Sequence, residues 1–210
     1  MLTKPATDML RELGLTGMAS GHQELETQTE ARHLQHGEWL APLSNDVIDV
    51  RSPATEEKVG QIPLGSAEDI DRAVKAARKA FDTTGWPWLP MKELGKYIRA
   101  IADAMEARAD ELAAITTAES GQPLEKNVRY QVGLAVMTFR YYADLCDTYQ
   151  IEERKQGLTT PFIVRKEAVG VAGIITPWNS PIITAAFTVP AALAAGCTVV
   201  LKPAPESPLH

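Results

Sequence analysis

The stretch from residue 168 to residue 202 limits the fold of this chain more than any other, because it contains no charged side chain before Lys202. An uncharged run of this length exceeds the roughly 20 apolar residues that a membrane-spanning helix needs. It is interrupted by prolines, which remove backbone donors, and by an amide, which is costly in lipid. The interrupting residues are Pro177, Asn179, Pro181 and Pro190. We therefore expect no membrane span in this stretch.

The same stretch divides into a strand, a turn, a helix and a second strand. The pieces are an apolar β-rich segment over 169–176, a proline-punctuated turn over 177–181, an alanine-rich helix over 182–195 that ends at Gly196, and a short strand over 198–201. This order predicts a βαβ unit whose parallel strands are buried on both faces and therefore look continuously apolar. The predicted helix is long enough for the crossover that parallel strands need.

The turn after the first strand is the predicted site. Ligands of open parallel sheets gather at the carboxyl ends of strands, and here that end presents Trp178 and Asn179. An asparagine amide aimed from a rigid strand end can donate to a developing oxyanion. Spacing alone leaves a second interpretation open and favours it: Asn179 or Ser180 is simply the N-cap of the following helix, a position where both residue types are common.

A long ordered motif extends on both sides of this turn. It reads Gly170-Val171-x-Gly173-x-Ile175-x-Pro177-Trp178-Asn179-x-Pro181, then Pro190-Ala191-x-x-Ala194-Ala195-Gly196-Cys197-Thr198-Val199-Val200-x-Lys202-Pro203. This motif resembles the cofactor-domain core of the NAD(P)-dependent aldehyde dehydrogenase superfamily, in its amino-terminal portion. The resemblance implies a Rossmann-like sheet with flanking helices, NAD or NADP as cofactor, and oxidation of an aldehyde to a carboxylic acid through a thiohemiacetal.

The resemblance also implies roles for single residues. Asn179 falls on the family's oxyanion-hole asparagine and is the catalytic residue expected in this chain. Lys202 falls on the lysine that hydrogen-bonds the adenosine ribose, while Thr176, Pro177 and Trp178 fall on positions lining the nicotinamide side. The full implied cofactor-binding set is Ile175, Thr176, Pro177, Trp178, Asn179, Lys202 and Glu206.

One position departs from the family pattern. Many members carry a glutamate three residues after the lysine, where it helps to hold the ribose hydroxyls, but here Pro205 stands there and the acid is Glu206. Either Glu206 takes over this role, or ribose recognition is weaker or tolerates a 2′-phosphate. The choice between NAD and NADP therefore stays open.

The resemblance covers the chain from about residue 36, which is less than half of a typical member. The family's cysteine nucleophile and glutamate base have no counterpart before His210, and Cys197 is expected to be inert because apolar burial raises the pKa of a thiol. We therefore expect the chain alone to be inactive. Two alternatives stay open: a fragment of an aldehyde dehydrogenase, or a truncated inactive relative acting as an interaction or nucleotide-binding module.

The chain is expected to fall into four parts. These are a poorly ordered leader over 1–35, the first strands and helices of the cofactor domain over 36–148, a hairpin over 149–167, and the first βαβ unit of the NAD(P)-binding domain over 168–210, cut short. Within the second part, strands are expected at 47–50 and 58–62, and a helix capped by Ser66 and ended by Gly85. Apolar stripes over 91–119 and 124–147 predict further helices, with Glu119 structural and Cys146 buried.

The predicted hairpin bears on partners. Strands are expected at 149–151 and 162–166, joined by the polar residues 152–160. In the aldehyde dehydrogenase family the corresponding hairpin pairs with another subunit, and exposed strand edges invite such pairing. The resemblance therefore implies a homo-oligomer, or pairing with a full-length dehydrogenase subunit, in addition to an aldehyde substrate.

Composition narrows the remaining function classes. The 210 residues carry a formal net charge of −6 and no basic stripe, so we expect no nucleic-acid partner. The two cysteines lack CxxC spacing and the four histidines are scattered, so we expect no metal site. Free cysteines fit a reducing compartment, and the acidic leader is unlike a mitochondrial transit peptide, so the cytoplasm is the expected location.

Overall fold

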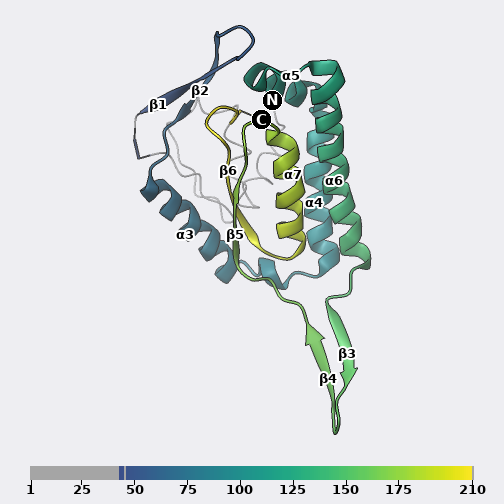
Figure 1. Ribbon diagram of the computed structural model, residues 1–210. Coiled ribbons are helices and arrows are strands. Elements are labelled where there is room, and N and C mark those ends of the chain that lie inside the picture. Colours follow the sequence, from purple (N-terminus) through teal and green to yellow (C-terminus); the bar gives the residue numbers. More distant parts are fainter. Residues whose placement is uncertain (1–42, 45, 210) are drawn as a thin grey trace.

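The structure is a computed structural model that describes residues 43, 44 and 46–209 (Figure 1). The leader predicted over 1–35 lies outside the described residues. The described part contains three two-stranded sheets together with several long helices. The predicted α/β class is therefore present.

The predicted βαβ unit is confirmed. Strand β5 (Val171–Ile175) pairs in parallel with β6 (Thr198–Lys202), and helix α7 (Pro181–Ala194) crosses between them. Proline in the first turn of α7 is favourable because that turn has no intrahelical use for the missing N–H. Gly196 follows the helix with a φ of 80°, a left-handed conformation that suits glycine.

The prediction that both faces of these strands are buried is wrong at the carboxyl end of β5. The Ile174 side chain is 8% exposed, whereas the neighbouring Ile175 side chain is 79% exposed. The reason is the position of helix α3 (Ala67–Thr83), which covers this face near the start of the strands. There the Thr198 hydroxyl donates to the Ala77 carbonyl at 3.0 Å. The opposite end of the face is left open.

A layer of helices forms most of the core. Helix α7 lies between the strands and the antiparallel pair α4 (Met91–Ala107) and α6 (Arg129–Thr148), as Figure 1 shows. Helix α5 (Ala109–Ser120) joins this pair through the π-helical turn η2 (Leu124–Val128). The predicted stripes supply buried core residues, which include Leu94, Ile98, Ile101, Met105, Val132, Ala135 and Phe139. No helix in the described part is long and apolar enough to cross a bilayer.

The start of α3 has the predicted cap. The Ser66 hydroxyl accepts from the Asp69 N–H at 3.2 Å, and the Asp69 carboxylate accepts from the Ser66 N–H at 2.9 Å. This reciprocal pair satisfies two donors that a helix start otherwise leaves free. The helix ends at Thr83, and Gly85 follows with a φ of 76° before the short helix η1 (Trp86–Trp88).

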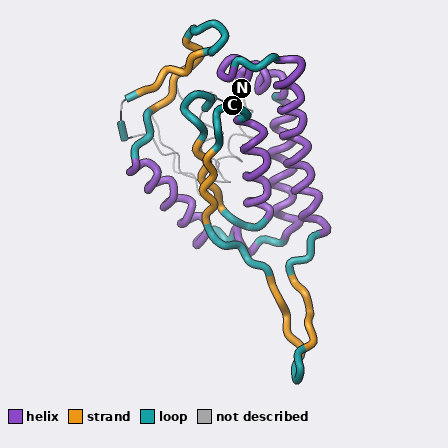
Figure 2. The backbone as a smooth tube through the Cα atoms, viewed as in Figure 1, coloured by secondary structure: helices purple, strands orange, loops and turns teal. Residues whose placement is uncertain are grey.

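Two antiparallel hairpins complete the fold. Strands β1 (Val47–Arg51) and β2 (Lys58–Pro63) lie where the sequence predicted them, beside α5. Strands β3 (Glu152–Gln156) and β4 (Pro161–Arg165) form a hairpin that extends away from the rest of the molecule (Figure 2).

The predicted position of the first strand in this second hairpin is wrong. The sequence placed it at 149–151 and assigned 152–160 to a connection, but the polar run 152–156 is itself the strand. All residues of both strands are exposed, so neither face needs an apolar row. Glu152 instead pairs with Arg165 of the facing strand, at 3.2 Å.

Candidate functional site

The carboxyl ends of β5 and β6 bring together residues from both ends of the uncharged run. In the parallel register Ile175 lies opposite Lys202. The backbone N–H of Thr176 then donates to the Lys202 carbonyl at 3.2 Å. Three of the predicted cofactor-binding residues, Ile175, Thr176 and Lys202, are therefore neighbours at one end of the sheet.

Thr176 has an unusual environment at this sheet end. The residue is 3% exposed, and its hydroxyl has no hydrogen-bond partner in the described structure. A buried hydroxyl without a hydrogen-bond partner destabilises the fold. A ligand or a water molecule that bonds to the hydroxyl removes this cost. Pro177 and Trp178 follow Thr176 directly, and both are exposed.

Asn179 is exposed, and its side-chain amide forms no hydrogen bond with any described residue. Helix α7 has Ser180 at its N-cap, with no side-chain capping bond. The interpretation of Asn179 as the N-cap is therefore wrong, because the chain turns into the helix one residue later. The amide of Asn179 is consequently available to a ligand at the strand end.

The Asn179 backbone is held by residues that the sequence did not single out. Its carbonyl accepts from the Gln122 side-chain amide at 2.5 Å. The Gln122 side-chain oxygen in turn accepts from the Asn127 side chain at 2.7 Å and from the Gln131 side chain at 2.6 Å. The signal in the sequence was Gln131, an amide lying on the same helical stripe as the apolar Val132 and Ala135.

A pocket of 600 Å³ lies beside this turn. Trp178 and Glu206 line it together with strand β1 and the end of α5. The hydroxyl of Ser207 donates to the Trp178 carbonyl at 3.0 Å, which fixes the segment after β6 against the turn. Ile175, Thr176, Asn179 and Lys202 are outside the pocket lining. The exposed Lys202 ammonium donates to its neighbour, the Pro203 carbonyl, at 3.2 Å.

Glu119 has the structural environment that the sequence suggested. Its side chain is 3% exposed, and one carboxylate oxygen accepts from the Leu209 N–H at 2.6 Å. This bond joins the end of α5 to the segment that follows β6. A buried carboxylate bonded in this way stabilises the arrangement around the pocket.

Both cysteines are buried. Burial, with a smaller contribution from the charge of Asp147, raises the pKa of the Cys146 thiol to about 11. Cys197 lies in the turn between α7 and β6, where its carbonyl accepts from the Trp86 indole N–H at 3.0 Å. Neither thiol is placed to attack a ligand at Asn179. Within the described residues, no group of three histidine, cysteine, aspartate or glutamate side chains could hold a metal ion.

Comparison with known proteins decides the family. A sequence model of the aldehyde dehydrogenase family matches residues 39–210. The chain belongs to the aldehyde dehydrogenase family. The resemblance that the motif around Asn179 suggested is therefore confirmed, and the match extends over both hairpins and all the described helices.

Individual members of the family show the extent of the match. The chain is 39% identical over 168 residues to geranial dehydrogenase from Castellaniella defragrans, covering 80% of this chain and 35% of that protein. It is 40% identical over 175 residues to aminoaldehyde dehydrogenase 2 from Zea mays, covering 80% and 34%. The chain thus spans about a third of the length of these relatives.

Solved structures of the family have the same fold over this region. An aldehyde dehydrogenase from Mycobacterium tuberculosis complexed with NAD⁺ matches with a TM-score of 0.76 and 39% identity, covering 82% of this chain and 36% of that one. A betaine aldehyde dehydrogenase from Staphylococcus aureus in complex with NAD⁺ matches with a TM-score of 0.78 and 33% identity, covering 82% and 34%.

Proposed function

We propose that this chain is the amino-terminal part of an NAD(P)-dependent aldehyde dehydrogenase, which oxidises an aldehyde to a carboxylic acid. The observation that carries the proposal is the exposed Asn179 amide, which has no described partner and lies at the carboxyl end of a parallel strand. In this proposal the amide donates to the aldehyde oxygen as that oxygen gains negative charge. One such donor contributes about 3 to 4 kcal/mol to stabilisation of the transition state.

The residues at the sheet end fit a dinucleotide. Strands β5 and β6 would be the first pair of a Rossmann-like sheet, in which ligands bind beyond the carboxyl ends. The exposed Lys202 ammonium would donate to a ribose hydroxyl, and Glu206 would accept from the same ribose in place of the absent acid at Pro205. The orphaned Thr176 hydroxyl and the exposed Ile175, Pro177 and Trp178 would contact the nicotinamide side. When bound, NAD or NADP supplies the hydride acceptor for the reaction.

The nucleophile is not one of the cysteines in this chain. Cys146 and Cys197 are buried, and the raised pKa of Cys146 keeps its thiol protonated at neutral pH. The chain alone is therefore expected to bind a cofactor without turning over an aldehyde.

A second candidate function is an inactive relative that pairs with a full-length dehydrogenase subunit. The exposed β3–β4 hairpin favours it, because Phe162, Ile163 and Val164 are apolar and exposed on β4. Co-purification with an intact dehydrogenase would support this function.

Calorimetric titration of the chain with NAD and with NADP tests the cofactor site. We expect one of the two to bind and the Lys202→Ala variant to bind about ten-fold more weakly, since it loses a hydrogen bond from a charged donor. Lys96→Ala is the matched control, because Lys96 is exposed on α4 and pairs with Glu93 away from the sheet end. Absence of binding to either nucleotide would remove the cofactor site from the proposal.

An assay of aldehyde oxidation by the chain tests whether it contains the nucleophile. Aldehyde-dependent reduction of NAD by the chain would overturn the assignment of catalysis to residues elsewhere, and replacing Cys146 and Cys197 by serine would then show whether either thiol is the nucleophile.

A further inference from the structure

We propose that Gln122 is a positioning residue for Asn179, an inference that rests on the proposed role of Asn179 as oxyanion donor. Gln122 follows helix α5, and its side-chain amide donates to the Asn179 carbonyl at 2.5 Å across 57 positions of the chain. The bond therefore connects the helical layer directly to the turn that presents the Asn179 amide. Gln122 acts through the backbone of Asn179 and has no contact with the reacting atoms in this assignment.

The orientation of the Gln122 amide is fixed by two further amides. Its oxygen accepts from the Asn127 side chain at 2.7 Å and from the Gln131 side chain at 2.6 Å. Gln131 donates its other hydrogen to the Asn127 side-chain oxygen at 2.9 Å. Because a primary amide carries its donors and its acceptor on opposite sides, these bonds leave the Gln122 NH₂ group facing Asn179.

The amide cluster is partly buried, so it would destabilise the fold without hydrogen bonds among its members. Gln131 is 6% exposed, and it lies beside Val128 and Val132, which are fully buried in the core. An amide in such surroundings destabilises the fold unless its hydrogen bonds are made. Both donor hydrogens of Gln131 are used within the cluster, while its side-chain oxygen has no hydrogen-bond partner in the described structure. The two donated bonds fix the orientation of this amide.

The π-helical turn η2 supplies the required geometry. The Val128 N–H donates to the Pro123 carbonyl, five residues earlier, at 3.2 Å. Turns of this kind insert a residue into a helix and re-aim the side chains around them, often at functional sites. Here the π turn carries Asn127, which lies four residues before Gln131 and therefore on the same face. Both amides reach back to Gln122, which lies just before the turn.

The Asn179 turn is consequently held at three successive carbonyls. Those of Trp178, Asn179 and Ser180 each accept from a different element of the fold. The donors, in that order, are Ser207 after β6, Gln122 after α5 and Thr184 in α7. Only the middle bond lies on the peptide that begins at Asn179, so it most directly limits the rotation that would swing the side-chain amide away from the strand end.

Two variants of Gln122 test this positioning in the whole 210-residue chain. Q122E keeps the size of the side chain and the two incoming bonds, but it replaces the donor to Asn179 by an oxygen. Q122M is neutral and removes both kinds of bond. We expect each to shift the NMR resonances of the Asn179 side-chain amide and of the Ser180 backbone amide, because the lost bond lies on the peptide that joins these two residues.

Q156E is the matched control, because Gln156 also donates to a backbone carbonyl, that of Gly157, but lies in the distant hairpin. It should leave the Asn179 signals unchanged. If Q122E unfolds the chain, Q122M decides the question because it adds no charge. A purely structural role would lower thermal stability without a local change at residue 179, and unchanged Asn179 signals in a folded Gln122 variant would overturn the proposal.

These measurements need neither cofactor nor aldehyde, so they separate the two proposals. A parent chain that binds neither NAD nor NADP would remove the cofactor site and leave the contact between Gln122 and Asn179 intact. Unchanged Asn179 signals would remove the positioning role and leave the cofactor site standing.

Discussion

At the scale of single residues, burial sets the chemistry of Cys146 and produces a pH dependence. The side chain is 2% exposed on α6, and its pKa rises from an ordinary value of 9.0 to about 11. Between these values the unfolded chain loses the thiol proton while the folded chain keeps it. The folded state then binds more protons, so the free energy of unfolding contributed by this group falls as the pH rises from about 9 towards 11.

Urea unfolding at pH 8, 9 and 10 measures this effect. The Cys146→Ala variant is expected to lose stability less steeply over this range than the parent chain, because it has no thiol to titrate. Its stability at pH 8 is expected to be lower, since alanine leaves the space of the sulfur empty. Only the slope is diagnostic, and equal slopes for the two proteins would contradict the raised pKa.

The same scale shows which residues a sequence can predict. The Ser66 cap and the burial of Cys146 depend on residues within a few positions along the chain, so the local pattern was sufficient. The bond from Gln122 to Asn179 spans 57 positions and needs the π turn to form, so no local pattern contains it. The available hint was Gln131, a polar residue on an otherwise apolar stripe.

At the scale of elements, the approach of α4 to α6 depends on Gly95. A Cβ atom added there would lie 2.9 Å from the Ala143 carbonyl oxygen and 2.9 Å from the Cys146 Cβ. Both contacts involve atoms close to the α6 backbone, so relief requires the helices to separate. We expect Gly95→Ala to lower the free energy of unfolding by about 1 to 2 kcal/mol, because overpacking outweighs the gain in helix propensity.

Gly133 supplies the control within the same helix pair. It lies in α6 with open space around the position of a Cβ atom. Gly133→Ala is therefore expected to raise the free energy of unfolding by about 0.5 to 1 kcal/mol, through the lower backbone entropy of the unfolded chain. Denaturant unfolding of both variants gives the comparison, and a stabilised Gly95→Ala protein would contradict the close packing.

The sequence predicted the helices and strands that bury one face, and it failed to predict the strand that buries neither. The stripes of α4 and α6 and the order of the βαβ unit follow from apolar periodicity. Strand β3 has no such pattern because solvent surrounds the hairpin, and its charged residues were assigned to a loop. The exposed Ile175 shows the opposite error, since an apolar run indicates burial without showing where a covering helix stops.

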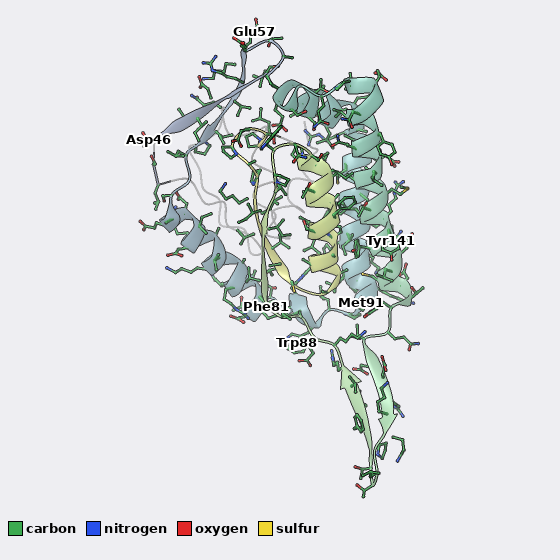
Figure 3. All side chains as sticks on the ribbon, in the orientation of Figure 1. Asp46, Glu57, Phe81, Trp88, Met91 and Tyr141 are labelled. Carbon is green, nitrogen blue, oxygen red and sulfur yellow. The ribbon has the colours of Figure 1, made fainter. Side chains whose placement is uncertain are left out.

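At the scale of the whole molecule, the hairpin is the part best placed to contact another chain. Strands β3 and β4 pair with each other and with no other described strand, which leaves both outer edges open. Figure 3 shows Trp88 at the end of the body from which the hairpin extends, and the Arg165 guanidinium lies 5.9 Å from the centre of that ring. The remaining strand residues reach into solvent and make no contribution to the core.

The apolar face of β4 is expected to drive association. Phe162 and Val164 are two residues apart and therefore point to the same side of the strand. Replacing both by lysine places two charges on this surface, so we expect association with a second copy, or with a full-length dehydrogenase subunit, to weaken at least ten-fold. Light scattering after size-exclusion chromatography measures the change, and the melting temperature should stay within about 2 °C because exposed substitutions have small effects on stability.

Leu158→Lys is the control for this surface. Leu158 is fully exposed in the loop between β3 and β4, outside the paired residues, so its replacement adds a charge to the hairpin without changing the face of β4. We expect the control to associate as the parent chain does. A parent chain that stays monomeric with and without a dehydrogenase subunit would refute pairing through the hairpin. Equal association by the parent and the double variant would instead move the contact to another surface, for which the exposed end of β5 at Ile175 is the next candidate because it is an open apolar strand end.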